Sequence, residues 1–130
     1  MGGDPRQSLG ILGEELACDA LRRQGYVILA RRYRTRLGEI DIVARDGGTV
    51  VFVEVKTRQG GAFGEGAEAV GPRKQQRIST MALHYLARHR LVDVPVRFDV
   101  VAVDAGEGGG HRIEVFQQAF DFTPGPRRRW

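Results

Sequence analysis

The sequence contains one cysteine, two lysines and no long apolar run, and each shortage excludes a class of protein. A lone Cys18 excludes an internal disulfide framework and is typical of a reducing compartment, so we expect a cytoplasmic protein. The longest aliphatic or aromatic runs are about four or five residues, whereas a membrane-spanning helix needs about 20, so we expect no membrane association. Residues 1–8 lack the apolar core of a secretory signal.

Lysine is scarce because arginine supplies 18 of the 20 basic residues, which outnumber 16 acidic ones and give a net charge of +4. Guanidinium groups match the geometry of phosphate oxygens, so this excess favours contact with nucleic acid. The alternative is a mildly basic protein whose arginine content reflects coding bias. The two lysines, Lys56 and Lys74, therefore need an explanation of their own.

The length and composition fit one globular domain. With 130 residues, roughly two thirds of the unfolded surface can be buried, and the sequence is 42% hydrophobic and 28% charged. We expect a flexible N-terminal tail over residues 1–8, a single domain over residues 9–122 and a basic C-terminal tail over residues 123–130. The tail at the C-terminus contains three consecutive arginines and has no recognisable pattern.

Apolar periodicity and turn residues predict two helices and five strands. The first helix is expected at residues 9–24, with Ser8 as its N-cap and Gly25 just after its end. The second is expected at residues 73–90, after a glycine-rich loop at 59–71. The strands are expected at residues 26–30 (fully buried), 39–45, 50–57, 96–104 and 112–116. This α-β-β-β-α-β order, with one further strand, predicts an α/β fold with a central mixed sheet flanked by helices.

A Gly-Gly pair at residues 47–48 predicts a two-residue turn between the second and third strands, because glycine accepts the positive φ of such turns. With this turn, Asp41 falls opposite Glu54, and Glu39 falls opposite Lys56. Alternation along the strands places these four side chains on one face. The other face is then part of the core and consists of Ile40, Ile42, Val53 and Val55.

Two carboxylates in this arrangement would repel each other, because opposed Cβ atoms lie roughly 4.5–5.5 Å apart. Either one is protonated or a cation lies between them, and Mg²⁺ takes one or two carboxylates together with waters and phosphate. Lys56 beside Asp41 and Glu54 could then stabilise a developing charge or hold an attacking water. The alternative is an exposed face on which Glu39 and Lys56 form an ordinary ion pair.

Asp41, followed on the next strand by Glu54-Val55-Lys56, resembles the D…(D/E)xK signature of the PD-(D/E)XK nuclease superfamily. The order of elements is similar to the restriction-endonuclease-like core of that superfamily, although Ile40 replaces its usual proline. The resemblance extends, over about residues 13–120, to the YraN-like family of uncharacterised bacterial proteins. The blocks that carry it are Gly13-Glu14 with Ala17, GEID at 38–41, VEVKTR at 53–58, KQ at 74–75 and RFDVV at 97–101.

The resemblance implies an endonuclease that hydrolyses phosphodiester bonds in DNA with Mg²⁺, or with Mn²⁺ as a substitute. Branched or junction DNA is one candidate form of the substrate, because the superfamily includes Holliday-junction resolvases. Asp41 and Glu54 would be metal ligands, with the backbone carbonyl of Val55 as a third. Lys56 would position or activate the hydrolytic water.

Two further glutamates receive roles from the same resemblance. Glu14 would face the site from the first helix, as a second metal ligand or as an anchor for water, and its position at the edge of the buried helix face fits this role. The adjacent Glu15 points away from that face. Glu39 would support the site as the partner of Lys56.

Basic and polar residues beside these blocks are the candidate contacts to nucleic acid. Some precede the second strand, one follows the third, and others open the second helix, whose N-terminus favours anions: Arg34, Arg36, Arg58, Lys74, Gln75 and Arg77. The alternatives are a charged sheet edge and a solvated helix start. Arg97 and Asp99 share a strand face, so we expect a structural ion pair between them.

Two functions from different classes are consistent with these residues. One is the metal-dependent nuclease; the other is a non-catalytic module of the same fold that binds nucleic acid or a protein partner. The chain has little room for a separate substrate-recognition domain, so a nuclease of this size could act as a homodimer. RNA in place of DNA is not distinguished by the sequence.

Overall fold

The structure, a computed structural model, describes residues 5–58, 70–105 and 110–125. In this part of the chain it has the elements α1 (Pro5–Arg23), β1 (Val27–Thr35), β2 (Gly38–Asp46), β3 (Thr49–Arg58), α2 (Pro72–Arg88), β4 (Val96–Ala105) and β5 (His111–Phe116). One sheet has the order β1-β2-β3-β4-β5, with β3 and β4 parallel and the other neighbours antiparallel. The predicted α/β class, mixed sheet and element order are confirmed, and they are consistent with a restriction-endonuclease-like core.

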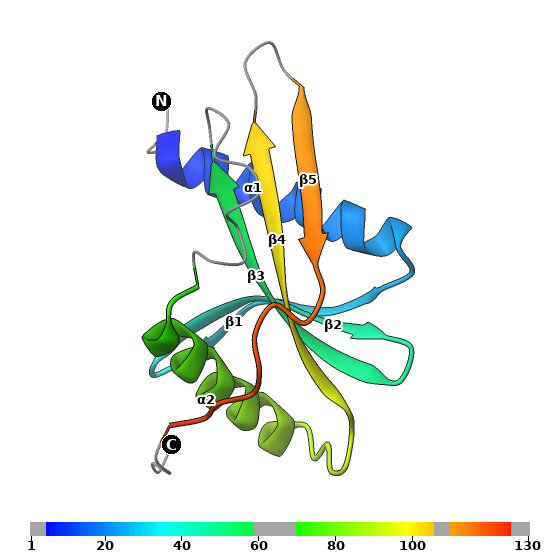
Figure 1. Ribbon diagram of the computed structural model, residues 1–130, viewed down its shortest axis with the longest axis vertical. Helices are drawn as coiled ribbons and strands as arrows, with labels where there is room; N and C mark the ends of the chain where they lie inside the picture. The colour runs from blue at the N-terminus through cyan, green and yellow to red at the C-terminus, as the bar shows by residue number, and fades with distance from the viewer. Residues whose placement is uncertain (1–4, 59–69, 106–109, 126–130) are drawn as a thin grey trace.

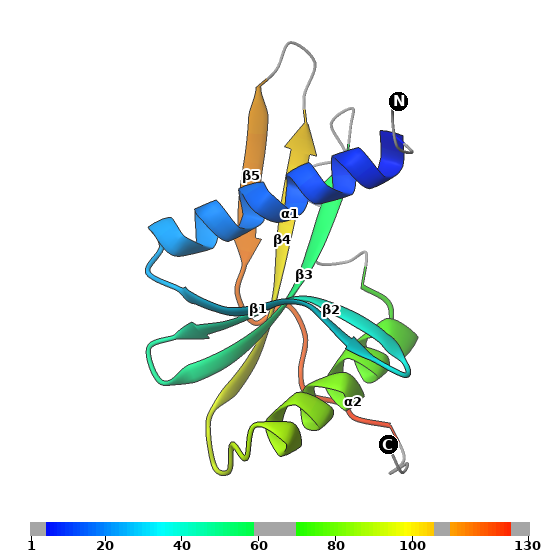
Figure 2. The same cartoon turned by 180° about the vertical axis from the view of Figure 1, so that it is seen from behind.

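The two helices cover opposite faces of the sheet (Figures 1 and 2). One core cluster packs Ala17 and Leu21 of α1 against apolar side chains that include Val51 and Val53 of β3. The other packs α2 residues against the opposite face and includes Phe52. Because β3 is buried on both faces, its sequence is a continuous apolar run rather than an alternating one.

Helix α1 begins at Pro5, so the prediction that Ser8 caps it is wrong. Proline suits the first turn of a helix, where its missing N–H has no partner to lose. The end of α1 agrees with the prediction: Gly25 has φ +92°, and the Tyr26 amide donates to the Leu21 carbonyl at 3.0 Å. Helix α2 ends at Arg88, two residues earlier than predicted.

Strand β1 is longer and more exposed than the buried strand predicted at residues 26–30. It runs through the arginine-rich segment to Thr35, and it forms an edge of the sheet. Val27 and Leu29 are 45% and 42% exposed, and the register with β2 shifts by one residue between Ile28 and Ala30. The apolar run was misleading because an edge strand with a bulge does not bury both of its faces.

The predicted hairpin register is confirmed from Asp46↔Thr49 to Ile42↔Val53, with Gly47 at φ +59° in the turn. Beyond Ile42 the backbone ladder between β2 and β3 stops. There the Val55 amide donates to the Asp41 carboxylate at 2.7 Å instead. The side chain of Asp41 therefore takes the place of a backbone acceptor at the point where the charged residues begin.

The side-chain alternation of β1 and β2 is interrupted at Arg32 and Asp41. Arg32 has φ +52°, and it lies between the ladder pairs Arg31↔Ile42 and Tyr33↔Ile40. As a result Ile40 packs in the α2 cluster and Ile42 in the α1 cluster, so the prediction that both share one core face is wrong. Asp41 lies at the position where β2 changes face.

The chain after β5 returns to α2, as the orange and red segment of Figure 1 shows. The amides of Thr123 and Gly125 each donate at 3.0 Å to a hydroxyl of α2. Residues 123–125 of the predicted tail are thus attached to the domain. The rest of that tail and most of the predicted loop, residues 59–69, lie outside the described residues. No helix within the described ranges is long and apolar enough to cross a bilayer.

Candidate active site

The face change in β2 gives Asp41 access to both sides of the sheet. On the α1 side it lines a pocket of about 440 Å³ with Glu14 and Val55. On the α2 side it lines a second pocket, of about 280 Å³, with Glu54 and Lys74. Strands β1, β2 and β3 and both helices thus contribute charged side chains around one aspartate.

Asp41 is the most perturbed acid of the site. Its pKa is raised to about 7, first by burial and then by the charges of Glu54 and Glu14, although the bond from the Val55 amide opposes the shift. Among the described residues Asp41 has no ion-pair partner. Lys56 and Lys74 act on Asp41 through their charges but make their direct contacts with Glu54, so the charge of Asp41 is only partly compensated. A strongly shifted pKa of this kind often marks a functional site.

Glu54 is buried on the α2 side and is held between two lysines. Lys56 Nζ lies 3.8 Å from Glu54 Oε1, and Lys74 Nζ, from the first turn of α2, contacts the same oxygen. The pKa of Lys56 is lowered by burial and by the adjacent Lys74. Burial acts to lower the pKa of Lys74, but the contact with Glu54, the charges of Glu54 and Asp41 and the contact with Lys56 together raise it. Both lysines of the sequence therefore form ion pairs with one carboxylate, that of Glu54.

Glu14 reaches the α1 side of the site and is 8% exposed, whereas Glu15 is exposed, as predicted. Its two carboxylate oxygens accept from Arg32 Nε at 3.3 and 3.2 Å, and Arg31 Nε lies 3.5 Å away. The sequence pattern favours a nucleic-acid contact or a charged sheet edge for this arginine-rich segment, and it gives no signal for the pairing of Arg31 and Arg32 with Glu14.

Gly13 explains how Glu14 comes this close to the sheet. A Cβ built at residue 13 would overlap the Thr57 side chain of β3, so only glycine permits the observed approach of α1. The main chain of α1 therefore lies directly against β3 at this point. The neighbouring Glu14 is carried to the edge of the pocket by that contact.

Glu39 does not take the predicted partner. It lies directly across from Arg34, and Arg34 Nε donates to its carboxylate at 2.9 Å. Lys56 instead pairs with Glu54. The prediction of a Glu39–Lys56 pair is wrong because the β2–β3 ladder ends at Ile42↔Val53, before those residues would face each other.

The oxygen atoms near Asp41 suit a hard divalent cation that is bound by two carboxylates. Asp41 and Glu54 offer carboxylate oxygens, the Val55 carbonyl is adjacent in sequence, and Mg²⁺ commonly uses one or two carboxylates with waters filling the other positions. No group of three or more His, Cys, Asp or Glu side chains in the described part of the chain converges on one point. The residues therefore fit a two-carboxylate site, with Glu14 held aside by Arg31 and Arg32.

The other candidate contacts to nucleic acid surround these pockets without converging. Arg34 lines the α1-side pocket and Arg77 the α2-side pocket, while Arg36 lies exposed in the turn after β1. Arg58 lies at the end of β3. Gln75 donates its side-chain amide to the Val70 carbonyl at 2.7 Å, so it holds the segment that leads into α2.

Comparison with known proteins identifies the family. The model of the uncharacterised protein family UPF0102 matches residues 13–103. The chain belongs to this family. It is the YraN-like family indicated by the sequence motifs. UPF0102 proteins from Syntrophus aciditrophicus and Geobacter sulfurreducens are 51% and 47% identical to it, over 89% and 94% of this chain and 91% and 95% of theirs.

A further UPF0102 protein, from Anaeromyxobacter dehalogenans, is 48% identical over 92% of this chain and 88% of its own. The region matched by the UPF0102 model includes every candidate residue of the site: Glu14, Asp41, Glu54, Lys56 and Lys74. The names of these relatives state the family and no reaction. Family membership therefore shows common ancestry, and only the site indicates which reaction the protein could catalyse.

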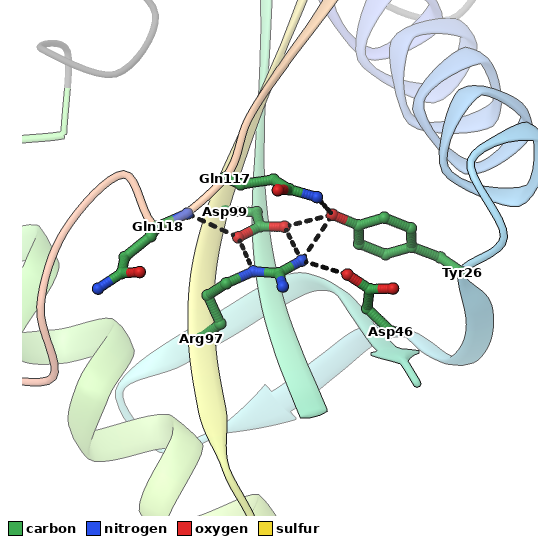
Figure 3. A network of polar contacts seen from close by, with 6 residues as sticks. All are labelled: Tyr26, Asp46, Arg97, Asp99, Gln117 and Gln118. Atoms are coloured by element: carbon green, nitrogen blue, oxygen red, sulfur yellow. Dashed lines mark hydrogen bonds and ion pairs between the residues drawn. The ribbon is translucent and has the colours of Figure 1, made fainter. Parts of the chain in front are cut away.

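This UPF0102 protein has a second buried polar cluster, centred on Asp99 of β4 (Figure 3). The predicted Arg97–Asp99 ion pair is confirmed at 2.9 Å. Asp99, which is fully buried, also accepts from the Tyr26 hydroxyl at 2.8 Å and the Gln118 amide at 3.0 Å. The cluster, which we call the Asp99 network, joins segments from across the chain: Tyr26, Asp46, Arg97, Asp99, Gln117 and Gln118.

Proposed function

We propose that this protein is a metal-dependent endonuclease that hydrolyses phosphodiester bonds in DNA. The observation that carries the proposal is the pair Asp41 and Glu54, two carboxylates brought together from adjacent strands in a site where Asp41 makes no direct ion pair with any described residue. A purely structural role gives no reason for such a pair, because two neighbouring carboxylates repel each other. The D…ExK motif of the sequence supports the same function.

Asp41 and Glu54 would hold Mg²⁺, with the Val55 carbonyl as a further ligand. The ion, when bound, would neutralise charge on the scissile phosphate and lower the pKa of an attacking water. Asp41 must lose its proton before it can bind a metal, so its pKa of about 7 predicts that metal binding strengthens as the pH rises through neutrality.

Lys56 is the candidate for holding the attacking water. Its lowered pKa makes the neutral amine more accessible near neutral pH than in an ordinary lysine, and a neutral amine can accept a proton. Glu14 would act from the α1 side as an anchor for water, because its oxygens lie in the same pocket as Asp41 and are oriented by two arginines. The exposed arginines near both pockets would follow the phosphate backbone.

The test is a calorimetric titration with Mg²⁺ and with Mn²⁺, followed by cleavage assays on linear, flapped and four-way DNA and on matched RNA. Asp41→Ala and Glu54→Ala are expected to lose metal binding and cleavage, and Lys56→Ala to lose cleavage by roughly 10²-fold or more. Glu15→Gln is the control, because it removes a carboxylate beside Glu14 that points away from the site.

Retained cleavage in Glu54→Ala would contradict the proposed site. Absence of metal binding in the wild type, with DNA present, would favour the non-catalytic module. That module would still bind DNA with an affinity that falls steeply with salt and does not depend on Mg²⁺. Cleavage of RNA alone would keep the chemistry and change the substrate.

A further inference from the structure

The contact between Lys74 and Glu54 places a cation from the protein on a carboxylate that the proposed function assigns to a metal. Lys74 comes from the first turn of α2, whereas Glu54 lies on β3, so the contact joins the helix to the sheet. The Lys74 side chain is 32% exposed and that of Glu54 is 8% exposed. The ammonium group therefore approaches a buried carboxylate from the solvent side.

The pocket around this contact is shared by Asp41, Glu54, Lys74 and Arg77. A divalent ion bound to Asp41 and Glu54 would compete with Lys74 for the same oxygen, since two cations at one carboxylate oxygen repel each other. Lys74 has a long, flexible and partly exposed side chain, so it can leave Glu54 without unfolding α2. The rest of its turn faces the same pocket, because Arg77 lines it as well.

We propose that Lys74 is an internal counter-ion that occupies Glu54 until a divalent metal replaces it and then binds a phosphate of the nucleic acid. The proposal rests on the proposed function and adds a link between its two ligands. Metal binding releases a cation for the phosphate, and phosphate binding removes a competitor of the metal. Each ligand therefore strengthens the binding of the other, and by thermodynamic reciprocity the two effects are equal.

The first test is the affinity for Mn²⁺, measured by calorimetry without nucleic acid, in the wild type and three variants. Lys74→Gln is expected to bind the metal roughly tenfold more tightly, because it removes the competing charge at contact distance. Lys74→Arg keeps the charge and is expected to stay near the wild type. Arg77→Gln is the matched control, because it removes a positive charge from the same pocket. Arg77 has no ion pair with any residue that the structure describes, so a change of less than about threefold in metal affinity is expected.

Equal or weaker metal binding by Lys74→Gln, with binding in the wild type, would overturn the counter-ion role and leave the metal site standing. Absence of binding in the wild type and in all three variants would overturn the metal site and the counter-ion role together. Circular dichroism of each variant confirms that α2 is intact.

The second test uses a short DNA duplex in EDTA, so it requires neither metal nor cleavage. Glu54→Gln is expected to tighten DNA binding and to make the slope of log affinity against log salt steeper by about one unit, because Lys74 is freed for a phosphate. The double variant Glu54→Gln/Lys74→Gln is expected to lose that gain. An unchanged salt slope in Glu54→Gln would contradict the transfer of Lys74 to phosphate.

Discussion

The candidate site and the Asp99 network are built from the same kinds of side chain, yet their charges are arranged differently. In the network, both carboxylate oxygens of Asp99 accept hydrogen bonds, and Arg97 supplies a positive charge at 2.9 Å. In the site, Asp41 accepts one amide bond and faces two further carboxylates. One buried aspartate is fully compensated, and the other is not.

Burial raises the pKa of a group in each cluster, but the consequences for charge and for stability differ. In the network burial, and then the bond to Asp99, raises the pKa of Tyr26 to about 12, so its hydroxyl stays a donor over the whole physiological range. In the site the pKa of Asp41 is raised to about 7, so that its charge changes near neutrality. A satisfied polar network fixes structure, whereas an unsatisfied one leaves free energy available for a ligand.

The largest expected effect is the loss of the network. Asp99→Ala would leave Arg97, Tyr26 and the Gln118 amide without their common acceptor, and breaking a buried ion pair in this way costs about 3–5 kcal/mol. Urea denaturation measures this loss as a lower free energy of unfolding. The matched control is Asp46→Ala, which removes a partner of the same Arg97 whose side chain is 33% exposed and should cost less than about 1 kcal/mol.

Equal losses in the two variants would mean that the network is not centred on Asp99. The stabilisation would then come from Arg97 and would be the same whether its partner is Asp46 or Asp99.

A smaller effect, of opposite sign, is expected in the site. Asp41→Asn removes an incompletely compensated buried charge while its amide oxygen can still accept from Val55, so the free energy of unfolding should rise by about 1–2 kcal/mol above pH 7. The pKa of Asp41 is about 7 when folded and about 3.9 when unfolded, so ionisation destabilises the fold as the pH rises between these values.

The gain in Asp41→Asn should therefore shrink as the pH falls toward about 4, where both states hold the proton. Chemical denaturation at a series of pH values measures it. Asp19→Asn, at an exposed aspartate of α1, serves as the control and should show no such gain. A gain that is independent of pH would mean that charge is not its cause.

The smallest expected effect is at the exposed ion pair of Arg34 and Glu39. The Arg34 side chain is 82% exposed, so Arg34→Ala should change the free energy of unfolding by less than about 0.5 kcal/mol. If Arg34 contacts a phosphate, the same variant should reduce the salt slope of DNA binding by about one unit. Stability is measured by thermal unfolding and the slope by fluorescence anisotropy; an unchanged slope would remove Arg34 from the interface.

Much of the fold could be predicted because it depends on local signals. The Gly-Gly turn set the register of β2 and β3 down to Ile42↔Val53, and the glycine at residue 25 ended α1 as expected. Errors arose where a tertiary contact overrides the local signal. The apolar start of β1 indicated burial, but its position at the sheet edge leaves Val27 and Leu29 partly exposed.

The proximity of the candidate residues was more predictable than their pairings. Strand alternation and a motif predicted that Asp41, Glu54 and Lys56 lie together, and the family resemblance added Glu14, whose position at the edge of a helix face fits; these residues line the two pockets or pair with residues that do. The positive φ of Arg32 has no sequence signal, since arginine rarely adopts it, and this irregularity ends the simple alternation that predicted a Glu39–Lys56 pair. The Lys74–Glu54 contact depends on where α2 crosses the sheet, which no local pattern specifies.

The close approach of Gly13 to Thr57 has a consequence for how the sequence can vary. Any side chain at residue 13 meets the Thr57 side chain, so the two positions cannot be scored independently in a mutational library. Alanine at residue 13 should become acceptable mainly in combination with a smaller residue at position 57. In a library that varies both positions, the tolerated pairs should have a similar summed side-chain volume. Because the spacing between α1 and β3 sets this volume, the library would measure that spacing without a structure.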